Sequence, residues 1–118
     1  MRTIIAGSRT IRDEKSVFEV IDRCVDSNKL EVTEVLCGLA KGVDIIGEKW
    51  GLSKEIPVKF FPARWKMYGK RAGYIRNAEM AENADALVAI WDGMSRGTEM
   101  MIKIATEKEL KVFVCIYP

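Results

Sequence analysis

Four glycine-containing segments of this 118-residue sequence carry hydroxyl or charged side chains, the combination that binds phosphate through backbone amides and basic groups. The first segment is Gly7-Ser8-Arg9-Thr10, where a glycine allows close approach of the backbone to a ligand. Arg9 can make a two-pronged contact with a phosphate. An ordinary turn between a strand and a helix explains the same residues equally well.

The second segment runs from residue 38 to residue 44 and places two glycines around a lysine. Gly38 and Gly42 flank Lys41 just before a predicted helix, which is typical of an anion-binding helix start. No Lys-Ser or Lys-Thr pair follows Gly42, so the segment is not a Walker motif. Asp44 either binds a ribose hydroxyl or complements the dipole in the first turn of the helix.

The third segment, residues 92–99, is the strongest local signal. Gly93 and Gly97, together with Ser95 and Thr98, open a predicted helix whose first backbone N–H groups lack intrahelical partners. Met101 follows Thr98 by three residues, so no carboxylate completes a capping box there. A ligand phosphate would take that place. The alternative is a self-capped helix with water on the spare donors.

The fourth segment combines a tryptophan with basic residues near a helix start. We expect Arg76 and Asn77 to point a guanidinium and an amide into one crevice, with Trp65 stacking on a base or closing a lid. A solvated basic helix face is the alternative. The full set is Trp65, Gly69, Lys70, Gly73, Arg76 and Asn77.

Composition excludes several classes of site. The chain has no histidine, which excludes Ser-His-Asp triads and most transition-metal sites. Its net charge of +2 is too small to indicate nucleic acid as the main partner. Between residues 62 and 78 there are five basic residues and no acidic one, a local patch that suits a small anionic ligand. We expect Cys24, Cys37 and Cys115 to be buried thiols in a reducing cytoplasm.

Five short apolar runs alternate with helix-like segments. The runs are nearly continuous rather than alternating, which predicts a parallel sheet buried on both faces. They span Thr3–Ala6, Val32–Cys37, Val58–Phe61, Ala86–Trp91 and Val112–Ile116.

Helical spacing of apolar residues fills the gaps between these runs. Predicted helices follow Asp13, centre on Val43 to Trp50, span about 71–83 and include Met101 on a core face. The stretch 63–69 is predicted to be irregular, and Met94, Met100 and Met101 are predicted to pack in the core or its loops. Right-handed crossovers then give one three-layer, Rossmann-like domain over residues 1–118, with a five-stranded parallel sheet in the order 3-2-1-4-5.

The order of these motifs resembles the YspA, cpYpsA-related branch of the SLOG superfamily over essentially the whole chain. The resemblance rests on Gly-Ser-Arg after the first strand, Gly-x-x-x-Gly-x-Asp after the second, Ala72-Gly73-x-x-Arg76-Asn77 and Ser95-Arg96-Gly97-Thr98. It implies a Rossmann-like fold that binds nucleotides or nucleotide-derived sugars. Relatives include the LOG phosphoribohydrolases and sensor domains for signalling nucleotides in antiviral systems.

The same resemblance implies roles for individual residues. Gly97 and Thr98 match the phosphate-binding Gly-Thr of the family, and Arg76 matches an arginine that works at the ribose in the hydrolases. Those hydrolases carry a glutamate where this chain has Met101. Glu99 is a poor substitute, because helical residues two apart point about 200° from each other.

We therefore expect a cytoplasmic module that binds a nucleotide-derived ligand of the phosphoribosyl or ADP-ribose type, as a sensor or a sequestering protein. The enzymatic alternative is a nucleoside-phosphate N-glycosidase, with Arg76 and Glu99 as catalytic candidates and Asp44 or Glu48 as other carboxylates. A third, less favoured alternative is a nucleic-acid-binding protein that uses the basic patch from Arg64 to Arg76. A membrane is not an expected partner, and no cofactor or metal is expected. Exposed apolar groups such as Trp50, Met67 and Tyr74 would favour a homo-oligomer, a dimer or higher. The expected ligand-binding residues are Gly7, Ser8, Arg9, Gly38, Lys41, Gly42, Asp44, Arg76, Asn77, Gly93, Ser95, Arg96, Gly97 and Thr98.

Overall fold

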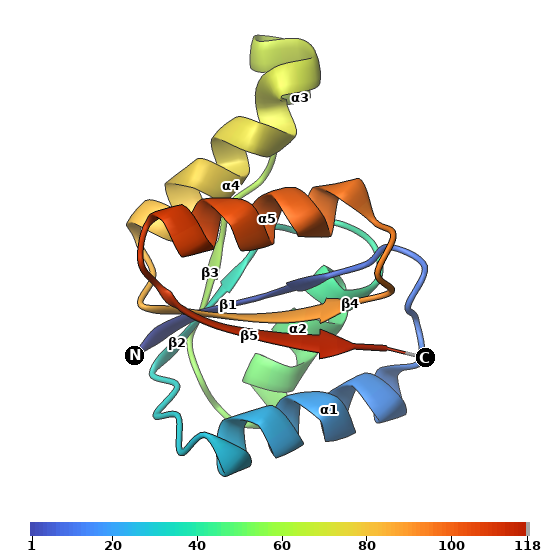
Figure 1. Cartoon of the computed structure of the whole chain (residues 1–118), viewed down its shortest axis with the longest axis vertical. Helices are drawn as coiled ribbons and strands as arrows, with labels where there is room; N and C mark the ends of the chain where they lie inside the picture. The colour runs from blue at the N-terminus through green and yellow to red at the C-terminus, as the bar shows by residue number, and fades with distance from the viewer. Residues whose placement is uncertain (118) are drawn as a thin grey trace.

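Five parallel strands form the centre of the protein in a computed structural model, which describes residues 1–117 (Figure 1). The sheet order is β3-β2-β1-β4-β5, as the sequence predicts. Parallel pairing brings the carboxyl ends of the strands to one edge of the sheet. The strands are β1 (Arg2–Gly7), β2 (Glu34–Cys37), β3 (Val58–Phe60), β4 (Ala86–Trp91) and β5 (Lys111–Ile116).

Helices cover both faces of the sheet. One face carries α1 (Glu14–Ser27) and α2 (Val43–Ser53), and the other carries α4 (Ala72–Glu82) and α5 (Arg96–Glu107) (Figure 1). Two helices per face follow from right-handed crossovers that turn to opposite sides of β1. Among residues 1–117, no helix has the length and apolar character needed to cross a bilayer.

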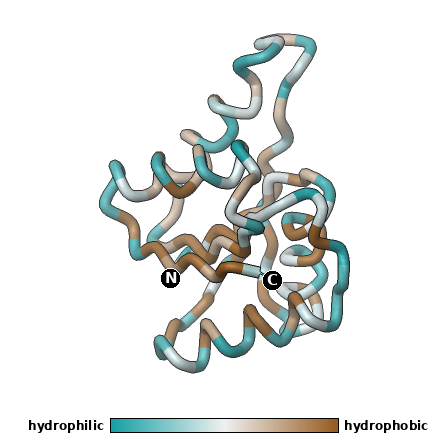
Figure 2. Tube along the Cα trace, turned by 45° about the vertical axis from the view of Figure 1, so that its right-hand side comes forward, coloured by the Kyte–Doolittle hydropathy of each residue, from teal (hydrophilic) through white to brown (hydrophobic). Residues whose placement is uncertain are grey.

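The core is split into two layers by the sheet. Consecutive strand residues point to opposite faces, so Ile4 packs towards α4 and α5 while Ile5 packs towards α1 and α2. Leu36 and Val35 divide in the same way. The strands therefore appear as apolar segments between more polar helices in Figure 2.

The stretch between β3 and α4 differs from its predicted irregular form. It contains a one-turn helix, α3 (Trp65–Tyr68), followed by a 3₁₀ turn, η1 (Gly69–Arg71). Four residues are too few for a helical repeat of apolar positions to register in sequence. α3 stands away from the body of the molecule (Figure 1).

Three side-chain expectations are wrong. Trp50 is buried rather than exposed, and its indole N–H donates to Asp22 at 2.8 Å. Met94 is 83% exposed and packs in no core. Cys24 and Cys37 are buried as expected, but Cys115 on the edge strand β5 is only partly buried.

Candidate functional site

A cleft of about 250 Å³ opens at the carboxyl edge of the sheet, between the loops that follow β1 and β2 and the starts of α4 and α5. In an open parallel sheet this edge is where ligands bind, because β1 is the point at which the strand order reverses. The cleft is lined by Ala6, Gly7, Arg9, Ala40, Asp44, Trp65, Lys70, Gly73, Tyr74, Arg76, Asn77, Ser95, Gly97, Thr98, Met100 and Met101.

Eight of the fourteen expected ligand-binding residues line this cleft. They are Gly7, Arg9, Asp44, Arg76, Asn77, Ser95, Gly97 and Thr98. The other six lie outside its lining: Ser8, Gly38, Lys41, Gly42, Gly93 and Arg96. The structure therefore separates eight residues that face the cleft from six that lie behind it or beside neighbouring depressions.

Asp44 is a buried carboxylate in the wall of the cleft. Only 5% of the residue is exposed, and its Oδ1 accepts a hydrogen bond of 3.2 Å from the backbone N–H of Gly7. Burial raises the pKa of Asp44 to about 6, although Arg76 and the Gly7 amide act in the opposite direction. The carboxyl can consequently gain or lose a proton near neutral pH.

Arg76 lies beside this carboxylate and is tied to the protein at two points. Its Nη1 donates to the carbonyl of Gly38, and its Nε donates to Oδ1 of Asn77 at 2.8 Å. Burial lowers the pKa of Arg76, while Asp44 raises it. A Cβ on Gly38 would stand 2.8 Å from Oδ2 of Asp44 and 2.9 Å from Nη1 of Arg76. Gly38 thus makes room for the pair without lining the cleft.

Ser8 and Gly42 form a support behind the cleft. The fully buried Ser8 hydroxyl accepts the backbone N–H of Asp92 at 3.0 Å, which joins the loops after β1 and β4. Gly42 has a φ of 78°, and a Cβ there would lie 2.5 Å from the carbonyl of Ser8. Only glycine fits both requirements.

The start of α5 is capped by the protein, as the self-capped alternative describes. Ser95 is the N-cap, and its Oγ accepts the backbone N–H of Thr98 at 3.5 Å. Oδ1 of Asp92 accepts the backbone N–H groups of Met94 and Ser95, each at 2.8 Å. Gly97, in contrast, has no atom within 4 Å of the position a Cβ would take, apart from its chain neighbours and the backbone of its own helix, among residues 1–117. The wall at Gly97 is therefore open to the cleft.

The cleft is electropositive. Arg9, Lys70 and Arg76 line it, and Asp44 is the one acidic side chain in its lining within residues 1–117. Arg9 is exposed and takes part in none of the ion pairs found over the described part of the chain. Its guanidinium is thus available to an anion.

Glu99 faces elsewhere. It lines a separate depression with Arg96 and Lys103 on the outer side of α5, whereas the buried Met101 lines the cleft. This is the geometry that the helical repeat predicts for residues two apart.

Aromatic rings stand at the cleft on the α3–α4 side. Trp65 and Tyr74 both line it while remaining 53% and 54% exposed. Sequence reasoning included Trp65 in the constellation but missed Tyr74. The sequence spacing does indicate this position, because Tyr74 precedes Asn77 by three residues and the two therefore share one helix face.

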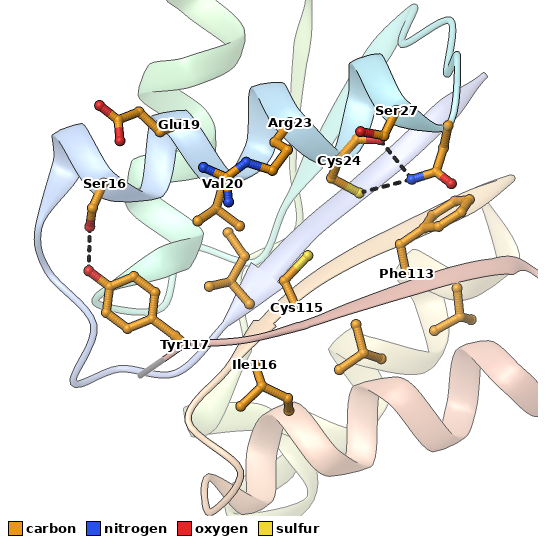
Figure 3. A pocket seen from close by; sticks show the side chains of 14 residues that line it. Ser16, Glu19, Val20, Arg23, Cys24, Ser27, Phe113, Cys115, Ile116 and Tyr117 are labelled. Carbon is orange, nitrogen blue, oxygen red and sulfur yellow. Dashed lines mark hydrogen bonds between the residues drawn. The ribbon is translucent and has the colours of Figure 1, made fainter.

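A larger groove of about 720 Å³ runs between α1 and the edge strand β5 (Figure 3). Its charged side chains, Glu19 and Arg23, have opposite signs. The thiols of Cys24 and Cys115 lie close together there, and burial with the neighbouring thiol raises the pKa of Cys24 to about 11. Among the residues that line this groove, no group of cationic side chains or unpaired backbone N–H groups comes together. The larger volume of the groove is therefore not enough to identify it as a ligand site. Within residues 1–117 no three Cys, Asp or Glu side chains gather closely enough to hold a metal.

Comparisons with known proteins agree with the fold and with the family resemblance. A family model described as the YspA, cpYpsA-related SLOG family matches residues 1–68. The Gene 61 protein of Mycobacterium phage D29 is 30% identical over 117 residues, covering 94% of this chain and 93% of the phage protein.

One solved structure is similar across almost the whole chain. It is DNA processing protein A from Streptococcus pneumoniae, with a TM-score of 0.71 and 20% identity. The match covers 96% of this chain but 49% of the Streptococcus chain, so this protein spans about half of that length. At this identity the likeness shows the Rossmann-like fold.

Proposed function

Because the chain belongs to the YspA, cpYpsA-related SLOG family, we propose that its cleft binds a nucleotide-derived ligand containing a phosphoribosyl group. The observation that carries this proposal is the convergence of Arg9, Arg76 and the open backbone at Gly97 on one small cleft. A phosphate is the group that best matches two guanidiniums beside the exposed backbone of Gly97, the part of the α5 N-terminus that Ser95 and Asp92 do not cap. In this proposal the protein acts as a sensor or a sequestering module.

The size of the cleft suggests that it encloses the phosphate and ribose of the ligand and leaves the base outside. A volume of about 250 Å³ lies below the roughly 300–1,000 Å³ typical of sites that enclose a drug-sized molecule. The phosphate would lie near Gly97 and Arg9, and the ribose near Asp44. The base would then extend outwards against the exposed rings of Trp65 and Tyr74. The name of the Streptococcus protein, DNA processing protein A, is compatible with a nucleotide chemistry of this kind.

Calorimetric titration with AMP, ADP-ribose, NAD and cyclic nucleotides tests the proposal. We expect binding by at least one of these compounds and at least a tenfold loss of affinity in Arg9→Gln. Arg96→Gln is the matched control, because Arg96 lies outside the cleft lining and should change affinity little. Flat titrations for all of these compounds with folded protein contradict the proposal.

A second candidate is cleavage of an N-glycosidic bond in the same cleft. Asp44 favours it, because a buried carboxyl with a pKa of about 6 beside a guanidinium is suited to stabilise an oxocarbenium-like centre or to activate water. Incubation with nucleoside monophosphates followed by chromatography should release free base with the native chain and not with Asp44→Asn. Intact substrate at high protein concentration excludes this reaction and leaves binding.

A further inference from the structure

The segment of residues 64–74, here called the basic arm, projects from the body of the molecule (Figure 1). It borders the cleft, because Trp65, Lys70 and Tyr74 belong to the cleft lining. It contains α3, η1 and the first residues of α4. Its four basic side chains are Arg64, Lys66, Lys70 and Arg71, all exposed, and it contains no acidic residue. None of the four makes an ion pair within residues 1–117. The arm therefore presents uncompensated positive charge.

The same arm exposes large rings that a globular protein normally buries. Trp65, Tyr68 and Tyr74 are 53%, 42% and 54% exposed, and Met67 is 65% exposed. The Trp65 ring lies close to the backbone of α4, since its Cη2 is 3.6 Å from the position a Cβ on Gly73 would take. Flat apolar faces thus alternate with cationic groups along one short segment.

The positive charge of the basic arm indicates which kind of partner would cover these rings. A second copy docked arm to arm would bring four unpaired positive charges against four more, which opposes a two-fold interface. A single-stranded nucleic acid supplies what the arm lacks: phosphates for the basic groups and unstacked bases for the rings. Trp65, Lys70 and Tyr74 also line the cleft, so the arm and the nucleotide cleft form one continuous surface. This last step rests on the proposed function.

We propose that the basic arm binds a short single-stranded nucleic acid, with its phosphates on the four basic side chains and its bases on Trp65, Tyr68 and Tyr74. The small net charge of the chain argues against a long polyanion, because electrostatic attraction then acts only near the arm. A strand of a few nucleotides needs only that local charge.

Fluorescence anisotropy with a labelled oligothymidylate of about 12 nucleotides tests this inference. The arm variant Lys66→Gln/Arg71→Gln removes two exposed basic groups that lie outside the cleft lining. The control Lys15→Gln/Lys29→Gln removes the same charge from exposed positions far from the arm in sequence. We expect affinity for the oligonucleotide to fall at least tenfold in the arm variant and to change less than twofold in the control. The negative slope of log affinity against log salt should become shallower by roughly 1.4, about 0.7 for each lost phosphate contact.

Stacking gives a second, independent readout. Trp65 is far more exposed than the buried Trp50, so the oligonucleotide should quench the intrinsic fluorescence of the native chain. We expect Trp65→Phe to remove most of that quenching, and Tyr68→Leu to weaken binding about tenfold without changing the circular dichroism spectrum.

Several results would overturn the inference. They are no anisotropy change at about 50 mM salt, equal losses in the arm and control variants, binding to anionic phospholipid vesicles in place of the oligonucleotide, and a dimer that the arm variant dissociates. The proposed function is judged separately, because Lys66→Gln/Arg71→Gln leaves Arg9, Asp44 and Gly97 intact. Loss of oligonucleotide binding with retained mononucleotide binding is the expected pattern. A native chain that binds mononucleotides but no oligonucleotide contradicts this inference alone.

Discussion

The Asp44 carboxyl is both buried in the protein and part of the candidate ligand site. It is almost fully enclosed, yet it lies in the lining of an electropositive cleft and accepts a backbone hydrogen bond from Gly7. Its pKa is raised from 3.8 to about 6, so the folded protein binds this proton more tightly than the unfolded chain does. The carboxyl therefore contributes stability below pH 3.8, and that contribution is lost as pH rises through about 6.

Asp44→Asn should remove this pH dependence. A pKa raised by about 2 units corresponds to about 3 kcal/mol between the two protonation states. We expect the native chain to lose most of that unfolding free energy, relative to Asp44→Asn, between pH 4 and pH 7.5. Urea unfolding of both proteins at the two pH values measures the difference. A constant difference would show that the carboxyl does not titrate in this range.

Two glycines of the same site separate a structural role from a binding role. In Gly38→Ala the new methyl would collide with Asp44 and Arg76, so we expect a loss of about 1–3 kcal/mol in unfolding free energy. In Gly97→Ala it meets no protein atom, and the helix gains up to about 1 kcal/mol. Titration with the best nucleotide ligand should nevertheless show weaker binding for Gly97→Ala. Unchanged affinity would place the ligand away from Gly97.

At the scale of single elements, apolar runs and helical spacing predicted the strands and the long helices well. The β4 strand begins and ends at the predicted residues, because every residue of the run is buried or nearly so. Val32 falls outside β2, which starts at Glu34. α3 was missed because one helical turn carries no repeat, and its place outside the core depends on the whole fold.

The candidate site was predictable in position and less so in detail. The loops after parallel strands must meet at one edge, and this brought Gly7, Asp44 and Thr98 together as expected. Lys41 and Arg96 occur in the same loops but lie outside the cleft lining. Spacing along the chain does not fix the direction of a side chain at the first turn of a helix, so sequence alone cannot separate these two groups.

The first turn of α5 offers a prediction at this scale. Ser95→Ala removes the N-cap oxygen that accepts the Thr98 amide, and should cost about 1 kcal/mol of unfolding free energy. Ser27→Ala, at the exposed last position of α1, is the control and should change stability by less than about 0.5 kcal/mol. Urea denaturation of both variants makes the comparison. Equal stability of the two would show that Asp92 alone supports the turn.

For the whole molecule, the cleft exists only when six elements come together, since β1, α2, α3, η1, α4 and α5 each supply part of its lining. A ligand of the folded state therefore stabilises all of them at once. At a ligand concentration 100 times the dissociation constant we expect a gain of about 2.7 kcal/mol in unfolding free energy. Denaturation with and without the nucleotide identified by calorimetry tests this, and Arg9→Gln should lose most of the gain. The homo-oligomer expected from sequence stays a prediction, for sedimentation analysis to measure.

The projecting basic arm also determines where limited proteolysis should cleave the protein. Trypsin cleaves after lysine and arginine, and Arg64, Lys66, Lys70 and Arg71 all lie exposed in the one-turn helix and the 3₁₀ turn or immediately before them, where little core packing opposes local opening. The first nick under mild digestion should therefore fall in this segment and leave two fragments that stay associated through the intact sheet. Any molecule that covers the arm would slow that nick, so a timed digest reports occupancy of the arm without a label.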